Sequence, residues 1–234
     1  MCIHTVQAPS IDAIVDCGGY TGDSVYLLRE MFDTNGQTPI HVFEPSPAHA
    51  HNYDRMPNVI LHQKAVWITD GTIKLYLQLD NKGSPCSGMG SSIMREKTNV
   101  TDTCILVPCV DFSKWLMQTF PQGAHVVVKM NIEGAEYPVL WKMADDGAFS
   151  RVYMLYVQFH HEKYPQLASR QQYQQLIARV PLPIQEWDRD LLAKNRRSLK
   201  RIAFRTHRFL WQTAKRHWRA FIPHQQAERV VGDE

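Results

Sequence analysis

The chain has 234 residues, of which 44% are hydrophobic and 21% charged, a composition typical of one globular domain with room for an appendage. It contains no uninterrupted apolar run of about 18 residues, which excludes a bilayer-spanning helix, and residues 1–10 lack the charged start and apolar middle of a secretory signal. The five cysteines form no Cys-x-x-Cys pair, which argues against a disulfide framework or a zinc site. We therefore expect a cytoplasmic protein with reduced thiols.

The formal charge of +3 hides an asymmetry between the last part of the chain and the rest. Residues 189–219 contain eleven lysines and arginines and a single acid, Asp190, so this segment carries +10 and the remainder of the chain −7. Apolar residues in the same segment recur at helical spacing, largely opposite the cations. We therefore expect a domain of residues 1–188 and a basic amphipathic helical tail of residues 189–234.

The predicted elements alternate between strands and helices. An apolar run at residues 11–16 ends in a glycine-rich turn, and apolar residues then recur at helical spacing over residues 25–32. Further strands are predicted at residues 41–43, 59–67, 72–79, 103–110, 126–130 and 152–159. The remaining predicted helices cover residues 112–120 and 135–143, and the serine- and glycine-rich segment 82–92 is predicted to be a mobile surface loop. This alternation predicts an α/β fold with a mostly parallel sheet and helices on both faces.

Two polar stretches follow the first two strands, where open α/β sheets bind their ligands. The first turn places Asp16 before Gly18, Gly19 and Gly22, a D-x-G-x-x-x-G spacing that differs from the dinucleotide fingerprint G-x-G-x-x-G. Its glycines allow the backbone to approach a ligand closely, and its carboxylate suits a ligand with a cationic amino group. Glu44 ends the second strand, where an acid can accept hydrogen bonds from both hydroxyls of a ribose. Together these features predict a ligand that contains a nucleoside.

Five segments of the chain, in order, resemble the FkbM-type S-adenosylmethionine-dependent methyltransferases. They are IVDCGGYTGDS, HVFEPSP, VDFSKWL, VVVKMNIEGAEYPVL and LYVQFHHEK, and they extend over about residues 11–165. The resemblance implies a Rossmann-like class I methyltransferase fold, here with a basic C-terminal helical extension. It also implies methyl transfer from S-adenosyl-L-methionine, usually to a hydroxyl of a sugar, glycolipid or polyketide.

The resemblance assigns the cofactor-binding residues as well. The glycine-rich turn would line the methionine moiety, Glu44 would hold the ribose, and the segment at residues 63–66 would reach toward the adenine. The residues expected to bind the cofactor are Asp16, Gly18, Gly19, Gly22, Glu44 and Ala65.

At two positions the chain departs from the family's pattern. The family commonly reads Lys-x-Asp-x-Glu-Gly-x-Glu and, one strand later, Glu-x-His, whereas this chain reads KMNIEGAE at residues 129–136 and QFH at residues 158–160. Asn131 and Gln158 thus replace two carboxylates. Their amides can hydrogen-bond a hydroxyl, but they cannot take its proton at neutral pH. Because methyl transfer to an alcohol requires deprotonation, a base has to come from another residue.

The catalytic candidates are Lys129, Asn131, Glu133 and His160. His160 is the first candidate for the base because imidazole titrates near neutral pH, and Glu133 is the second. In the structural alternative, His160 is a hydrogen-bonded spacer and Glu133 a cap at the start of a helix. Convergence of Glu133, His160 and Glu162 could create a metal site, but we expect none.

These observations predict an S-adenosylmethionine-dependent O-methyltransferase that acts on a hydroxyl of a sugar, glycan or glycolipid. One alternative is a cofactor-binding protein that has lost catalysis through its two amides. Another is a nucleic-acid methyltransferase or binder recruited by the basic tail. The tail could instead lie on an anionic membrane surface or pack on the acidic body. The loop at residues 82–92 could close over the acceptor, with Arg95 and Lys97 meeting an anionic substrate.

Overall fold

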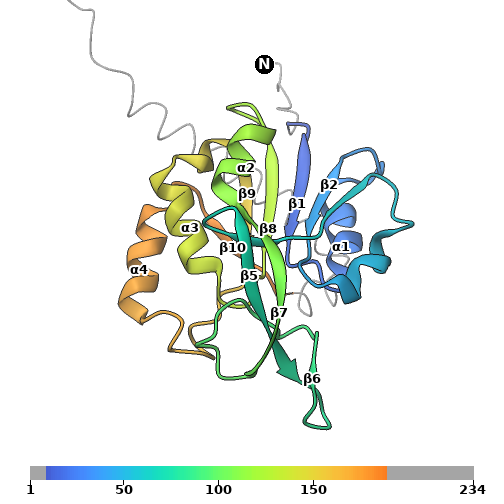
Figure 1. Ribbon diagram of the computed structural model, residues 1–234. Coiled ribbons are helices and arrows are strands. Elements are labelled where there is room, and N and C mark those ends of the chain that lie inside the picture. Colours follow the sequence, from blue (N-terminus) through green and yellow to red (C-terminus); the bar gives the residue numbers. More distant parts are fainter. Residues whose placement is uncertain (1–8, 189–234) are drawn as a thin grey trace, which may run out of the picture. The chain divides into compact units, whose positions relative to one another are not determined.

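The main sheet of the protein contains six parallel strands, as the computed structural model shows for residues 9–188, the described part of the chain (Figure 1). The strand order is β10-β9-β8-β1-β2-β3. The strands are β1 (Ala13–Cys17), β2 (Ile40–Phe43), β3 (Val59–His62), β8 (Val126–Met130), β9 (Val152–Val157) and β10 (Ile184–Glu186). The order reverses beside β1, because β2 lies on one side of it and β8 on the other. The loops that follow β1, β2 and β8 therefore meet at one edge, the usual ligand site of open α/β sheets.

Helices cover both faces of this sheet. They are α1 (Asp23–Phe32), α2 (Phe112–Thr119), α3 (Glu136–Asp145) and α4 (Arg170–Arg179). Val15 and Cys17 of β1 share one apolar core with side chains of α2, α3 and α4. On the opposite face, Phe32 at the end of α1 packs against Tyr156 of β9, with 5.8 Å between the ring centroids. The expected α/β fold with helices on both faces is confirmed.

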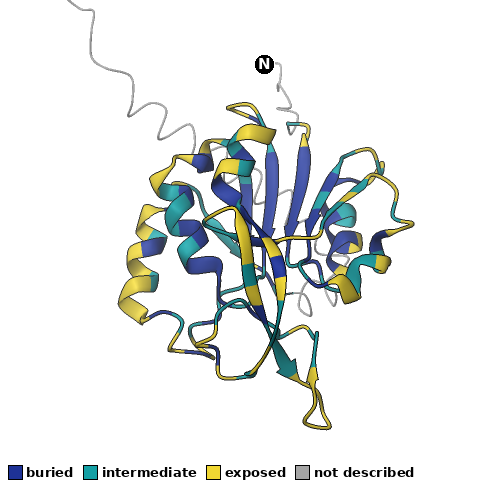
Figure 2. Cartoon of the chain, viewed as in Figure 1, coloured by how far each residue is buried: buried dark blue, intermediate teal, exposed yellow. Residues whose placement is uncertain are grey.

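The central strands have unbroken apolar sequences because both of their faces are covered. All five residues of β1 and all five of β8 are buried, whereas the outer surfaces of the helices are exposed (Figure 2). None of the helices described between residues 9 and 188 is long and apolar enough to cross a membrane.

A second, smaller sheet was not expected from the sequence. Its order is β4-β7-β5-β6, with β4 parallel to β7 and the other pairs antiparallel. Its strands are β4 (Ala65–Trp67), β5 (Gly71–Leu79), β6 (Pro85–Cys86) and β7 (Val100–Asp111). In Figure 1, β5 and β7 run side by side down to β6.

The prediction of one strand over residues 59–67 is wrong, because the chain divides there between the two sheets. Gln63 and Lys64 are exposed, and the Lys64 N–H donates to the His62 carbonyl in a tight turn, with 2.7 Å between the two atoms. The residues before the turn form β3 and those after it form β4. The elements β10, α4, η1 (Pro47–Tyr53) and η2 (Ala148–Arg151) also went unpredicted. The predicted tail of residues 189–234 lies outside the described residues.

Candidate functional site

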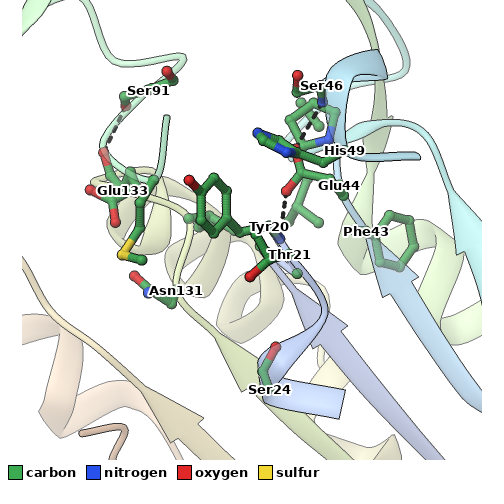
Figure 3. A pocket seen from close by; sticks show the side chains of 18 of the residues that line it. Tyr20, Thr21, Ser24, Phe43, Glu44, Ser46, His49, Ser91, Asn131 and Glu133 are labelled. Atoms are coloured by element: carbon green, nitrogen blue, oxygen red, sulfur yellow. Dashed lines mark hydrogen bonds between the residues drawn. The ribbon is translucent and has the colours of Figure 1, made fainter. Parts of the chain in front are cut away.

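A pocket of about 1170 Å³, partly open to solvent, lies at the carboxyl edge of the main sheet. Its walls come from the loops after β1, β2, β8 and β9, from β4, and from a segment of residues 87–93 that we call the strap. Figure 3 shows Glu44 on one side of the pocket and Asn131 with Glu133 on the other. The predicted site residues that line it are Gly18, Gly19, Glu44, Ala65, Lys129, Asn131 and Glu133. Asp16, Gly22 and His160 lie outside its lining.

The glycine-rich turn has a packing role that requires glycine at two positions. Gly18 has φ +83°, and a Cβ built on it would lie 1.9 Å from the carbonyl oxygen of Asn131, so the loops after β1 and β8 touch through their backbones. Gly22 has φ +86° and immediately precedes α1. Both positions use the left-handed conformation that glycine adopts without steric cost.

A buried ion pair lies directly behind this turn. Lys129 Nζ is 2.9 Å from Asp16 Oδ1, and the two side chains are 2% and 0% exposed. Lys129 Nζ also donates to the Gly18 carbonyl (2.8 Å), while Ser24 Oγ donates to Asp16 Oδ2 (2.5 Å). The Asp16 carboxylate is therefore balanced inside the protein and does not face the pocket. Trp187, after β10, lies over the ammonium with 5.6 Å between Nζ and the ring centroid.

Glu44 is held by backbone donors at the end of β2. Its Oε2 accepts from the Tyr20 N–H (2.8 Å) and its Oε1 from the Ser46 N–H (2.9 Å), as the dashed lines in Figure 3 mark. Burial raises the pKa of Glu44, and the two backbone donors partly offset this effect. Because each carboxylate oxygen can accept more than one hydrogen bond, Glu44 keeps acceptor capacity for a ligand.

Four charged side chains form a buried charge chain beside the opposite wall. Glu133 Oε2 lies 2.5 Å from Lys97 Nζ, and Glu133 Oε1 lies 3.5 Å from His160 Nε2. His160 Nδ1 is in turn 3.3 Å from Glu136 Oε1. The Glu136 carboxylate also accepts from the Ile132 and Gly134 N–H groups, both at 2.8 Å, which fixes the turn between β8 and α3.

The charge chain determines how His160 and Glu133 ionise. Burial by itself lowers the pKa of His160, but the hydrogen bonds and charges of Glu133 and Glu136 outweigh it and raise the pKa to about 9. Burial raises the pKa of Glu133, but His160 and Lys97 outweigh it, and the net pKa is lowered. At neutral pH, His160 is therefore a cation and Glu133 a carboxylate.

The two amides lie at the pocket. Asn131 Oδ1 is buried and accepts no hydrogen bond from the described residues, and Asn131 is among the residues that line the pocket. Gln158 lines the same pocket. Glu162, by contrast, is exposed, and within residues 9–188 no three His, Cys, Asp or Glu side chains are grouped as metal ligands.

The strap is fixed to both sides of the pocket. On the β2 side, Ser87 Oγ lies 2.5 Å from Ser46 Oγ, and the Ser87 carbonyl lies 2.7 Å from His49 Nε2. On the β8 side, Ser92 Oγ donates to the Glu133 carbonyl (2.7 Å). Most of the strap belongs to the segment 82–92 that was predicted to be a mobile surface loop, and the strap is tied to both sides of the pocket that it lines.

Sequence reasoning missed the positions of several residues. Lys97 was expected to meet a substrate, but it is 1% exposed and bound to Glu133, and Arg95 forms an ion pair with Asp102. Trp187 follows a short strand beyond the segments that carry the family resemblance. The pocket role of Tyr20 had one available signal, its place inside the glycine-rich turn.

The sequence matches the family model described as the methyltransferase FkbM domain over residues 16–222. Among solved structures, the chain is similar to the methyltransferase FkbM from Methylobacillus flagellatus KT, with a TM-score of 0.36 and 14% sequence identity. That likeness covers 61% of this chain and 31% of the other, so the chain spans about a third of that protein's length. No curated protein is significantly similar to it.

Proposed function

This chain belongs to the FkbM methyltransferase family, whose model matches residues 16–222, and from that premise we propose that it transfers a methyl group from S-adenosyl-L-methionine to a hydroxyl of a sugar, glycan or glycolipid. The observation that carries the proposal is that two hydrogen-bond acceptors of the protein lie on opposite sides of one pocket. Glu44 offers a buried carboxylate on one side, and Asn131 offers an amide oxygen to which no residue between 9 and 188 donates on the other. A nucleoside and a hydroxyl-bearing acceptor could thus be held together.

The residues on the β1 and β2 side fit the cofactor. In our proposal, Glu44 accepts hydrogen bonds from the ribose hydroxyls, with its orientation fixed by the N–H groups of Tyr20 and Ser46. We assign the backbone at Gly18 and Gly19 to the methionine moiety and Ala65 to the adenine, since all three residues line the pocket. Asp16 acts indirectly, by holding Lys129 beneath the turn. The bound cofactor supplies an electrophilic methyl group on its sulfonium.

The residues on the β8 and β9 side would orient the acceptor. Its hydroxyl donates to Asn131 Oδ1, which aims an oxygen lone pair at the methyl carbon. As the new C–O bond forms, the C–S electron pair remains on sulfur and the hydroxyl becomes strongly acidic. This proton then leaves its hydrogen bond to Asn131 Oδ1 and passes to the carboxylate of Glu133, since a base of low pKa suffices at that stage. His160 cannot take this role at neutral pH because it is already protonated, and we assign it to holding Glu133 ionised.

Calorimetric titration with S-adenosylhomocysteine tests the cofactor site. We expect micromolar binding by the wild type and a loss of about tenfold or more in Glu44→Ala, because each tenfold corresponds to about 1.4 kcal/mol, the scale of a hydrogen bond to a charged group. Glu162→Ala removes an exposed glutamate outside the pocket and is the matched control. Equal affinity in wild type and Glu44→Ala would contradict the proposed site.

A second candidate function is cofactor binding without catalysis. It is favoured by Asn131 and Gln158 and by the protonated state of His160, which together leave Glu133 as the base we assign. The double variant Asn131→Asp with Gln158→Glu distinguishes the two functions in an assay of S-adenosylhomocysteine production with sugar and glycan acceptors. The proposed function expects turnover by the wild type. Turnover confined to the double variant would instead identify the wild type as a binding protein.

A further inference from the structure

Lys97 is a fully buried lysine that neither the sequence motifs nor the proposed reaction uses. It lies between the strap and β7, and its side chain has no exposed surface. Its ammonium contacts Glu133 Oε2 (2.5 Å) and the carbonyl of Gly90 in the strap (2.8 Å), and it lies 4.9 Å from the ring centroid of Tyr164. Burying a charge is costly unless it is paired and hydrogen-bonded, so this arrangement holds three separate parts of the chain together.

Glu133 depends on these contacts for its conformation. Its φ of +58° lies in the left-handed region, which is uncommon for a residue with a side chain and persists only where the surroundings hold it. The strap holds its backbone through Ser92, and Lys97 holds its side chain. Both anchors come from residues that precede β7 in the sequence, and both act on one residue of the pocket wall.

The other end of the strap is fixed to the opposite wall. Ser87 bonds to Ser46 and His49 in the stretch that follows Glu44, and Ser46 also donates its N–H to Glu44. A displacement of the strap at Gly90, where Lys97 holds it, would therefore affect the ribose-binding side as well as the acceptor side. The strap connects the two halves of the pocket.

We propose that Lys97 is a positioning residue, whose ammonium locks Glu133 to the strap and so holds the two walls of the pocket in place around the nucleoside of S-adenosyl compounds. This inference rests on the proposed function for the identity of the ligand. It assigns Lys97 no contact with the reacting atoms. Its effect passes through Glu133 and through the carbonyl of Gly90.

Lys97→Met tests the proposal, because methionine replaces much of the side chain's volume without its charge. We expect affinity for S-adenosylhomocysteine, measured by calorimetry, to fall about tenfold or more, a change of about 1.4 kcal/mol or more. We also expect faster amide hydrogen exchange in residues 87–93 with unchanged exchange in β1 and β8. Lys114→Met is the matched control, since Lys114 of α2 forms an exposed ion pair with Asp70 (2.9 Å), and its loss should leave both measurements unchanged.

Two results would overturn the proposal. One is unchanged affinity in Lys97→Met, and the other is exchange that rises equally in the strap, β1 and β8, as a general loss of stability would produce. If the single variant fails to fold because Glu133 loses its partner, Lys97→Met with Glu133→Gln removes both charges and must show the same loss of affinity. If the wild type itself does not bind S-adenosylhomocysteine, the proposed function fails, and exchange in the strap alone decides the role of Lys97.

Discussion

At His160, two carboxylates outweigh the effect of burial, and the raised pKa links the ionisation of one side chain to the stability of the fold. The folded-state pKa of about 9 lies above the ordinary value of 6.5. Protonation of His160 therefore stabilises the fold fully below pH 6.5, and this contribution is lost as the pH rises through about 9. A pKa difference of this size corresponds to a contribution of roughly 3 kcal/mol to the free energy of unfolding.

We therefore predict that His160→Gln is less stable than the wild type at low pH. The difference in the free energy of unfolding between the two proteins should become smaller as the pH rises. Urea unfolding at pH 6 and at pH 9.5 gives the difference in the free energy of unfolding between the two proteins. Loss of packing in the variant contributes equally at both pH values, so the change with pH isolates the charge. A gap that stays constant, or that widens toward alkaline pH, would show that His160 is not held as a cation.

The candidate site could be predicted from the sequence only where residues follow strands of the main sheet directly. Gly18, Glu44 and Asn131 come immediately after buried apolar runs, so their place at one edge follows from the sheet itself. Lys97 could not be placed in this way, because nothing local predicts that a lysine in a polar loop loses all of its exposed surface. Its partner, Glu133, lies 36 residues away in sequence.

At the scale of elements, Gly18 in the turn between β1 and α1 can be compared with Gly123 in the loop before β8, because the two glycines have the same φ. Gly18 and Gly123 both have φ +83°, but a Cβ would lie 1.9 Å from the Asn131 carbonyl at the first and would meet nothing within 4 Å at the second. Alanine should cost about 1 kcal/mol at Gly123 for the backbone conformation alone. At Gly18 we expect a further 1–3 kcal/mol, roughly the cost of overpacking, because two backbones have to separate.

Urea unfolding of Gly18→Ala and Gly123→Ala measures this difference. Calorimetry with S-adenosylhomocysteine should also show weaker binding by Gly18→Ala and unchanged binding by Gly123→Ala, since the first glycine lines the pocket and the second does not. Equal losses of stability in the two variants would mean that the loops after β1 and β8 can move apart without cost.

The central strands of the main sheet, β1, β8 and β9, were the most predictable, because strands covered on both faces leave an unbroken apolar run. Strand-like sequence over residues 59–67 did not reveal which sheet each part joins, since both halves have the same character and only the turn at Gln63 and Lys64 separates them. The polar sequence of α4 has Leu176 as its buried residue and gave little periodicity to detect. These failures concern which sheet a strand joins and a helix with a single buried residue. The alternation of the other strands and helices predicted the fold class.

At the scale of the whole molecule, charge is divided unevenly along the chain. Residues 189–219 carry +10 and the remainder −7, whatever structure the segment adopts. A cluster of this size is attracted to anionic surfaces, by about 1 kcal/mol for each lysine or arginine near a membrane surface, and the attraction weakens with salt. For a protein proposed to act on glycans or glycolipids, we expect this segment to bring the chain to anionic lipid.

Co-sedimentation with vesicles rich in phosphatidylserine tests this expectation. The full chain should bind at low ionic strength and dissociate as salt is added, and vesicles of phosphatidylcholine alone should not bind it. Replacing Arg196, Arg197, Lys200 and Arg201 with glutamine should weaken binding by about 1 kcal/mol for each cation near the surface. We expect the substitutions to leave the affinity for S-adenosylhomocysteine unchanged, which would separate binding to lipid from binding to the cofactor. Tighter binding to a DNA or RNA oligonucleotide than to the vesicles, at the same salt, would instead favour nucleic acid as the partner of the segment.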